Sequence, residues 1–237
     1  MHFRGRAIGA SMRRMNPQRR HLLLGTAAAT AAGAAAIALP ALASTRRALA
    51  RMTDGPFYPA RAWRDKGPFS GDWDADLTRV ERNGRVATAR GEHLGLQAVV
   101  ADTEGRLIDN AEVEVWQCDV MQTYRHPDVV ATAGRFDEGF QGFGAARSGK
   151  DGGLSLRTIK PVTYPGRTPH IHVKLRHAAF GEFTSQLFLA GDPGNARDFL
   201  WRSVPQSDRT ALEMMLVPAG PESGLRWQVR HTLIVPS

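Results

Sequence analysis

Cysteine is nearly absent from this sequence: Cys118 is the only one among 237 residues. A single cysteine cannot form an intramolecular disulfide, which excludes a disulfide-stabilised scaffold. Tyrosine is also scarce, with only Tyr58, Tyr124 and Tyr164. The H-E-x-x-H pattern typical of zinc hydrolases is missing, and no internal repeat or low-complexity segment follows residue 43. The chain must therefore fold around a hydrophobic core, and any chemistry must come from other residue types.

Acidic residues are missing from the first 43 positions, which contain six arginines. An uncharged Leu/Ala/Gly stretch at 22–39 follows, then Pro40 and an Ala-Leu-Ala site that ends at Ala43. This order predicts a signal peptide over 1–43, cleaved near Ala43. The Arg19-Arg20 pair predicts the twin-arginine (Tat) export machinery as a partner, and hence a periplasmic or extracellular protein. The alternative is an anchor retained in the membrane.

The net charge of the whole chain is +8, but it falls to +2 once the six arginines of 1–43 are removed. The basic character thus belongs mainly to the predicted signal, and the sequence predicts no nucleic-acid partner. The remaining residues, 44–237, are enough for one domain with a sizeable core. We expect a short, basic and mobile lead-in at 44–52 and a surface loop over 60–90.

From residue 91 onward, apolar and polar residues alternate in short runs bounded by turns, which is typical of strands. The expected strands are 94–100, 112–118, 154–159, 170–176, 186–189 and 227–235. Helical patterns are confined to about 196–204 and 207–216, and a Gly-rich loop occupies 120–150. The sequence predicts an all-β fold, an antiparallel β-sandwich with long loops and one or two short C-terminal helices.

The most informative segment is 164–174, which reads YPGRTPHIHVK. Side chains two apart on a strand share a face, so His170 and His172 can present two imidazoles to one ion. Tyr164 can add a phenolate oxygen. Two nitrogens and a hard anionic oxygen suit a trivalent metal better than zinc. The alternative is that His170 and His172 form the ordinary polar face of a half-buried strand.

The motifs along the chain, taken in order, resemble the intradiol ring-cleavage dioxygenase family, over roughly residues 53–192. The resemblance is closest to the exported, single-chain members of the protocatechuate 3,4-dioxygenase and catechol 1,2-dioxygenase type. The motifs are DGPFYP (54–59), AEVEVWQCD (111–119), FQGFG (140–144), LRTIKPVTYPGRTPHIHVK (156–174) and SQLFLAGDP (185–193).

The resemblance implies a non-haem Fe(III) held by two tyrosines and two histidines, which fall on Tyr124, Tyr164, His170 and His172. It also places a substrate-side arginine at Arg167 and a glutamine lining the site at Gln186. The implied catalytic residues are Arg167, Tyr164 and Gln186. The implied reaction uses O2 to cleave a catechol-type ring between its hydroxylated carbons, giving a muconate-type diacid, as in aromatic compound catabolism.

Two other hypotheses stay open at this point. One is a transthyretin-like β-sandwich that acts as a binding or carrier module without catalytic iron, although such a module has no need of both Tyr124 and Tyr164. The other is an enzyme of the same fold with a changed reaction. The sequence does not choose the catechol, and Arg125, Arg135 and Arg157 are candidates to pair with an acidic ring substituent. A homo-oligomer is possible, but one chain carries all four expected ligands.

Overall fold

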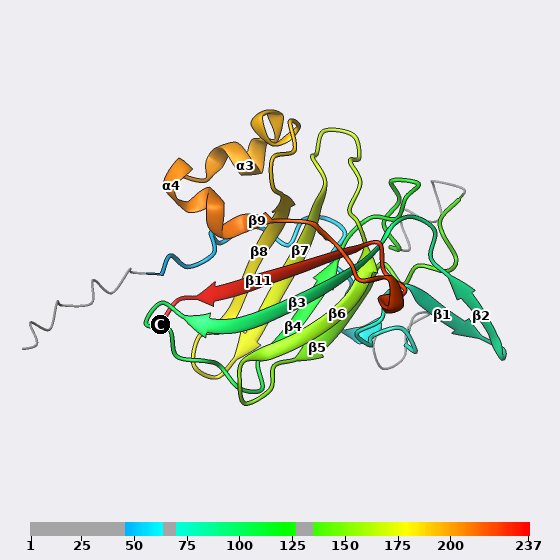
Figure 1. Ribbon diagram of the computed structural model, residues 1–237, viewed down its shortest axis with the longest axis horizontal. Coiled ribbons are helices and arrows are strands. Elements are labelled where there is room, and N and C mark those ends of the chain that lie inside the picture. Colours follow the sequence, from blue (N-terminus) through cyan, green and yellow to red (C-terminus); the bar gives the residue numbers. More distant parts are fainter. Residues whose placement is uncertain (1–45, 64–69, 127–134) are drawn as a thin grey trace, which may run out of the picture. The chain divides into compact units, whose positions relative to one another are not determined.

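The structure, a computed structural model, describes residues 46–63, 70–126 and 135–237. Within these ranges the strands form two main sheets and a separate hairpin, with short helices near the C-terminus (Figure 1). The predicted sandwich with short C-terminal helices is therefore confirmed. No helix in the described ranges is long and apolar enough to cross a membrane. The predicted signal, 1–43, lies outside them.

One sheet has four strands, and β3 lies at its centre. β3 pairs antiparallel with β6 and parallel with β11, so this sheet is mixed rather than purely antiparallel. In spatial order its strands are β10 (Val217–Pro218), β11 (Trp227–Val235), β3 (His93–Asp102) and β6 (Gly153–Ile159).

The other sheet has five strands, and β7 lies at its centre. β7 pairs antiparallel with β4 and with β8, while the short edge strand β9 runs parallel to β8. In spatial order its strands are β5 (Phe143–Arg147), β4 (Glu112–Trp116), β7 (His170–His177), β8 (Gly181–Leu189) and β9 (Glu213–Met214).

The two faces of β7 have different neighbours. Ile171, Val173 and Leu175 are fully buried in the main hydrophobic core. His170 and His172 alternate with them on the opposite face, as the pattern predicts. They are nevertheless buried too, with 2% and 4% of their surface exposed. The outer face of this sheet is thus covered by other parts of the chain, which creates a second buried region next to the core.

The N-terminal segment 46–63 is hydrogen-bonded to both sheets. The backbone N–H of Leu49 donates to Ile234 in one sheet, and that of Met52 donates to Thr184 in the other. Both side chains are buried in the core. The expectation of a mobile lead-in over 44–52 was therefore wrong for its described part, because two buried apolar side chains anchor it.

The predicted loop over 60–90 contains a hairpin that the sequence interpretation missed. Strands β1 (Arg79–Arg82) and β2 (Arg85–Thr88) pair antiparallel. They are joined at Asn83 and Gly84, whose φ angles are 51° and 71°. Asn-Gly with two positive φ angles is the strongest short hairpin signal in a sequence. The charged composition of the strands obscured it.

The C-terminal helices are shorter than predicted. The segment expected at 196–204 consists of the 3-10 turn η1 (Asn195–Arg197) and helix α3 (Phe199–Ser203). The segment expected at 207–216 consists of α4 (Gln206–Arg209) and η2 (Thr210–Leu212), and it then becomes strand β9. Met214 is fully buried and pairs with Leu189 of β8. Tertiary burial of that side chain overrides the local helical pattern. A last 3-10 turn, η3 (Pro221–Ser223), precedes β11.

Candidate metal centre

The two histidines of β7 place their Nε2 atoms 3.2 Å apart. The Nδ1 of His170 lies 2.6 Å from the carbonyl oxygen of Thr168. A carbonyl only accepts, so Nδ1 of His170 carries the proton and its Nε2 presents a lone pair. The His172 ring stacks on Trp116 of β4, with centroids 4.6 Å apart. Both imidazoles are therefore fixed in orientation by neighbouring groups.

Tyr124 brings a third donor atom to the same point. Its hydroxyl oxygen lies 3.4 Å from Nε2 of His170 and 3.2 Å from Nε2 of His172. A tight turn after β4 positions it, because the Asp119 carboxylate accepts from the backbone N–H groups of Met121 and Thr123. Phe57, from the N-terminal segment, stacks on the Tyr124 ring at 4.9 Å. Donor atoms from two distant parts of the sequence, Tyr124 and the His170–His172 pair of β7, thus converge.

Tyr164 lies beside this group on a short turn. Arg167 donates its backbone N–H to the Tyr164 carbonyl, and Gly166 has a φ of 83°. Pro165 followed by a glycine with positive φ is typical of a type II turn. The Tyr164 ring meets Tyr124 edge-on at 5.4 Å and lies 5.6 Å from the His170 ring. All four residues predicted as ligands are therefore neighbours, three of them with converging donor atoms.

Burial sets the protonation of these groups. Burial and the nearby Arg167 lower the pKa of His170 to about 4. Burial, with smaller effects of His170 and Arg167, lowers the pKa of His172 well below its usual value. Both imidazoles are therefore neutral at pH 7 and able to bind a metal. Burial, followed by the influence of Tyr164, raises the pKa of the Tyr124 phenol well above its usual value. A bound cation would reverse that effect.

The donor set fits a single metal ion. Ligand atoms about 2.1 Å from one ion lie roughly 3.0–3.4 Å apart at angles near 90–110°, which matches the separations of Tyr124, His170 and His172. In the described ranges no three His, Cys, Asp or Glu side chains gather to hold a metal, so a tyrosine oxygen is essential here. A phenolate oxygen and two imidazoles suit an ion that prefers oxygen.

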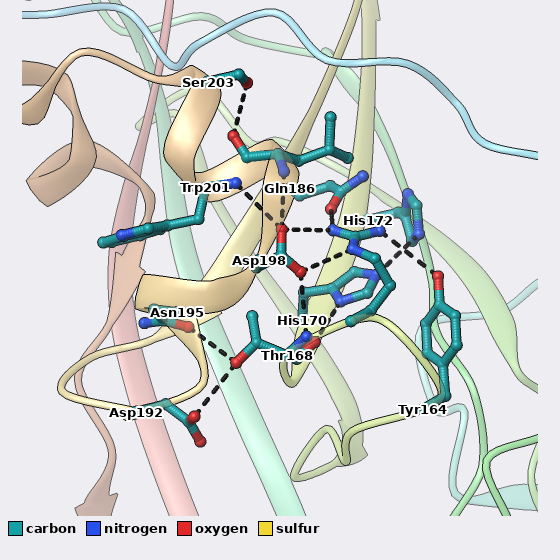
Figure 2. A network of polar contacts seen from close by, with 12 residues as sticks. Tyr164, Thr168, His170, His172, Gln186, Asp192, Asn195, Asp198, Trp201 and Ser203 are labelled. Atoms are coloured by element: carbon teal, nitrogen blue, oxygen red, sulfur yellow. Dashed lines mark hydrogen bonds and ion pairs between the residues drawn. The ribbon is translucent and has the colours of Figure 1, made fainter.

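Gln186, one of the two further residues expected at the site, lies next to the histidines (Figure 2). The other, Arg167, contacts both Gln186 and Tyr164. Gln186 faces His172 across the β7–β8 pair. Its Oε1 accepts from Nη2 of Arg167 at 2.6 Å, and Nη1 of Arg167 lies 3.5 Å from the Tyr164 hydroxyl. The Nε2 of Gln186 is buried and has no hydrogen-bond partner among the described residues. A guanidinium and a free amide N–H thus adjoin the site.

A cavity of about 660 Å³ leads to Tyr164 and Arg167. Arg197 also lines it, whereas the three arginines proposed from the sequence do not. Arg125 pairs with Asp72 at 2.9 Å, and Arg157 lies 3.9 Å from Asp76. Sequence reasoning therefore missed Arg197, because only the fold brings its 3-10 turn next to the loop of Tyr164.

The other residues singled out from the sequence pack around the centre. Tyr58 donates to Glu114 at 2.7 Å and meets Trp116 edge-on. Cys118 is buried, and burial together with Asp119 raises the pKa of its thiol to about 12. It is therefore a small apolar side chain rather than a reactive thiol.

Comparison with known proteins identifies relatives. The model of the family described as "Dioxygenase" matches residues 55–230. The protocatechuate 3,4-dioxygenase beta chain of Burkholderia cepacia is 32% identical over 165 residues, which are 66% of this chain and 67% of that one. Hydroxyquinol 1,2-dioxygenase of Corynebacterium glutamicum is 30% identical, and the match covers 54% of this chain and 45% of that one.

Two solved structures share the fold of this chain. The dioxygenase domain of a dioxygenase carbohydrate-binding protein fusion from Streptomyces sp. SirexAA-E matches 80% of this chain and 99% of its own. Its TM-score is 0.55 at 25% identity. An intradiol ring-cleavage dioxygenase from Tetranychus urticae, only 17% identical, shows the same fold at a TM-score of 0.58 over 81% of this chain and 95% of its own. The chain belongs to the intradiol ring-cleavage dioxygenase family.

Proposed function

We propose that this chain uses O2 to cleave a catechol-type ring between its two hydroxylated carbons, giving a muconate-type diacid. The family uses a non-haem Fe(III), and we assign its ligands here to Tyr124, Tyr164, His170 and His172. The observation that carries the assignment is the convergence of the Tyr124 oxygen with the two histidine Nε2 atoms at 3.2–3.4 Å. A carrier module has no use for such a buried set.

The two tyrosines have different surroundings, which suggests different roles. When bound, ferric iron acts as a Lewis acid that lowers the pKa of coordinated phenols and prepares the catechol for attack by O2. Tyr124 is only 4% exposed and is held by Phe57, so it stays in place. Tyr164 is half-buried and borders the cavity, where its oxygen can accept a proton from an incoming catechol hydroxyl.

Arg167 and Gln186 supply hydrogen-bond donors where negative charge develops. Nη1 of Arg167 points toward the Tyr164 oxygen, and Nη2 toward Gln186. As the bound catecholate becomes ketone-like, negative charge moves from its oxygen onto the ring carbon that O2 attacks, and a fixed guanidinium beside the ring stabilises that charge. The unpaired Nε2 of Gln186 is a further donor on the same side. Both groups are already in place before substrate arrives, so little reorganisation is needed.

The direct test of this function is an oxygen-uptake assay with product analysis. The iron-loaded protein is given catechol, protocatechuate and hydroxyquinol, and uptake is measured with an oxygen electrode. We expect one O2 per ring cleaved and, from ¹⁸O2, both labelled atoms in a single diacid. A semialdehyde product, a single labelled atom, or no uptake with any catechol would contradict the proposal.

We also propose that residues 1–43 direct export through the Tat machinery and are then removed. The support is the order of six arginines, an apolar stretch and the site at Ala43. N-terminal sequencing of protein from a Tat-competent bacterium is expected to give a start near Ser44, outside the cytoplasm. Substituting lysine for both Arg19 and Arg20 should block this. A full-length chain retained in the membrane would indicate an anchor instead.

A further inference from the structure

The Arg167 side chain is held by a residue that the sequence did not suggest. Its Nε donates to Oδ2 of Asp198 at 2.7 Å, and its Nη2 lies 3.5 Å from Oδ1. The pair is almost completely enclosed, with 8% of the arginine and 0% of the aspartate side chain exposed. Phe199 lies under the guanidinium, 5.3 Å from it to the ring centroid. Such a charge-assisted pair fixes the plane of the guanidinium as well as its position.

Asp198 is itself fixed by the fold. It is the N-cap of α3, and its Oδ1 accepts from the backbone N–H groups of Leu200 and Trp201 at 3.0 and 3.1 Å (Figure 2). Its Oδ2 also accepts from the N–H of Thr168 at 3.1 Å. One carboxylate therefore joins α3 to the turn that leads into β7. Its geometry is set by the backbone, so it can act as a rigid support.

The ionised state of Asp198 is favoured despite its burial. Burial opposes the charge, but hydrogen bonds from Arg167 and from the backbone N–H groups outweigh burial and hold the pKa below its usual value. The remaining edge of the guanidinium faces Tyr164 and Gln186. Because Asp198 holds Nε, Nη1 is directed to the Tyr164 hydroxyl and Nη2 to Gln186.

We propose that Asp198 is a positioning residue that aims Arg167 at the reacting ring. The proposal rests on the function proposed above. Its carboxylate contacts Arg167 and backbone N–H groups, so its effect on the reaction comes through Arg167. Because a small misplacement of a catalytic group has a large effect on rate, loss of this support should lower kcat about tenfold to hundredfold. Iron binding should persist, since all four proposed ligands remain.

The test uses Asp198→Asn and Asp198→Ser, which both keep a good N-cap acceptor for α3 but remove the charge. The matched control is Asp102→Asn on β3. Asp102 is also buried, and it accepts from Nε of Arg106 at 2.6 Å and from two backbone N–H groups. The control therefore removes a buried carboxylate charge with the same kinds of partners in the other sheet, and it leaves Arg167 unchanged.

We expect both Asp198 variants to bind iron as the unaltered protein does. Their kcat should fall by a larger factor than their KM rises. Asp102→Asn should keep the kcat of the unaltered protein. A second readout does not depend on turnover. In ¹⁵N NMR spectra recorded before iron is added, the Arg167 Nε–H signal, identified by its loss in Arg167→Gln, should move and exchange faster with water in both variants. Unchanged kcat together with an unchanged Nε–H signal would overturn the proposal.

The double variant Asp198→Asn/Arg167→Gln separates positioning from an independent role. If Asp198 acts only through Arg167, the double variant should be no slower than Arg167→Gln alone. A loss equal to the product of both single losses would refute the proposal. The double variant also leaves no unpaired buried charge, so it tests the idea even if the single variants fold poorly. If the unaltered protein binds iron but cleaves no catechol, the proposed function fails, whereas the NMR result still decides whether Asp198 holds Arg167.

Discussion

Replacing His172 with alanine should abolish iron binding and ring cleavage together. The His172 Nε2 lies 3.2 Å from both the His170 Nε2 and the Tyr124 oxygen, so the substitution removes one of the proposed metal ligands. Substituting a residue that only hydrogen-bonds a metal ligand typically weakens metal binding by about 10–100-fold. Loss of a ligand itself should weaken binding by more. Iron per chain, measured by plasma mass spectrometry after desalting, should fall to near zero.

His177→Ala is the control for this variant. His177 belongs to the same strand, β7, but it lies at the far end and accepts from the backbone N–H of Ala179. We expect it to keep iron and activity. Circular dichroism should show that both variants are folded. If His172→Ala retained a full complement of iron and normal turnover, the assignment of the centre would be wrong.

Arg167→Gln should keep the iron but slow the reaction. Glutamine preserves some hydrogen-bonding capacity but removes the positive charge next to the Tyr164 oxygen. Loss of one preorganised donor to a developing oxyanion typically costs about 10²–10³ in kcat, and we expect a loss of that size, with a smaller change in KM. Steady-state oxygen uptake at saturating catechol measures it.

Arg106→Gln is the matched control for charge removal. Arg106 pairs with Asp102 at 2.6 Å but is largely exposed and lies in the turn that follows β3. It should leave kcat unchanged. Equal effects of the two substitutions, or a normal kcat for Arg167→Gln, would show that the guanidinium of Arg167 has no role in the chemistry.

Much of the site could be predicted because its signals are local. The alternation in 170–176 correctly places His170 and His172 on one face. The Pro165-Gly166 pair is a turn signal, which explains how Tyr164 and Arg167 come beside the histidines. Gln186 lies opposite His172 because β8 follows β7 directly. These relations depend on strand period and short connections, which a sequence displays.

The parts that were missed depend on distant contacts. Asp198 follows Arg167 by 31 positions and has no motif of its own. Likewise, the expected helix over 207–216 ends early because Met214 pairs with β8, a choice made by the core rather than by local propensity. The Asn83-Gly84 hairpin is different: its signal was present but was outweighed by the charged residues around it.

If Tyr124, Tyr164, His170 and His172 hold ferric iron that binds catechol, the purified protein should be coloured. A visible absorption spectrum with iron analysis, recorded before and after adding catechol without O2, tests this. We expect one iron per chain and a tyrosinate-to-Fe(III) charge-transfer band that shifts with catechol and is altered in Tyr124→Phe. A protein that stays colourless and iron-free after incubation with iron would contradict the assignment.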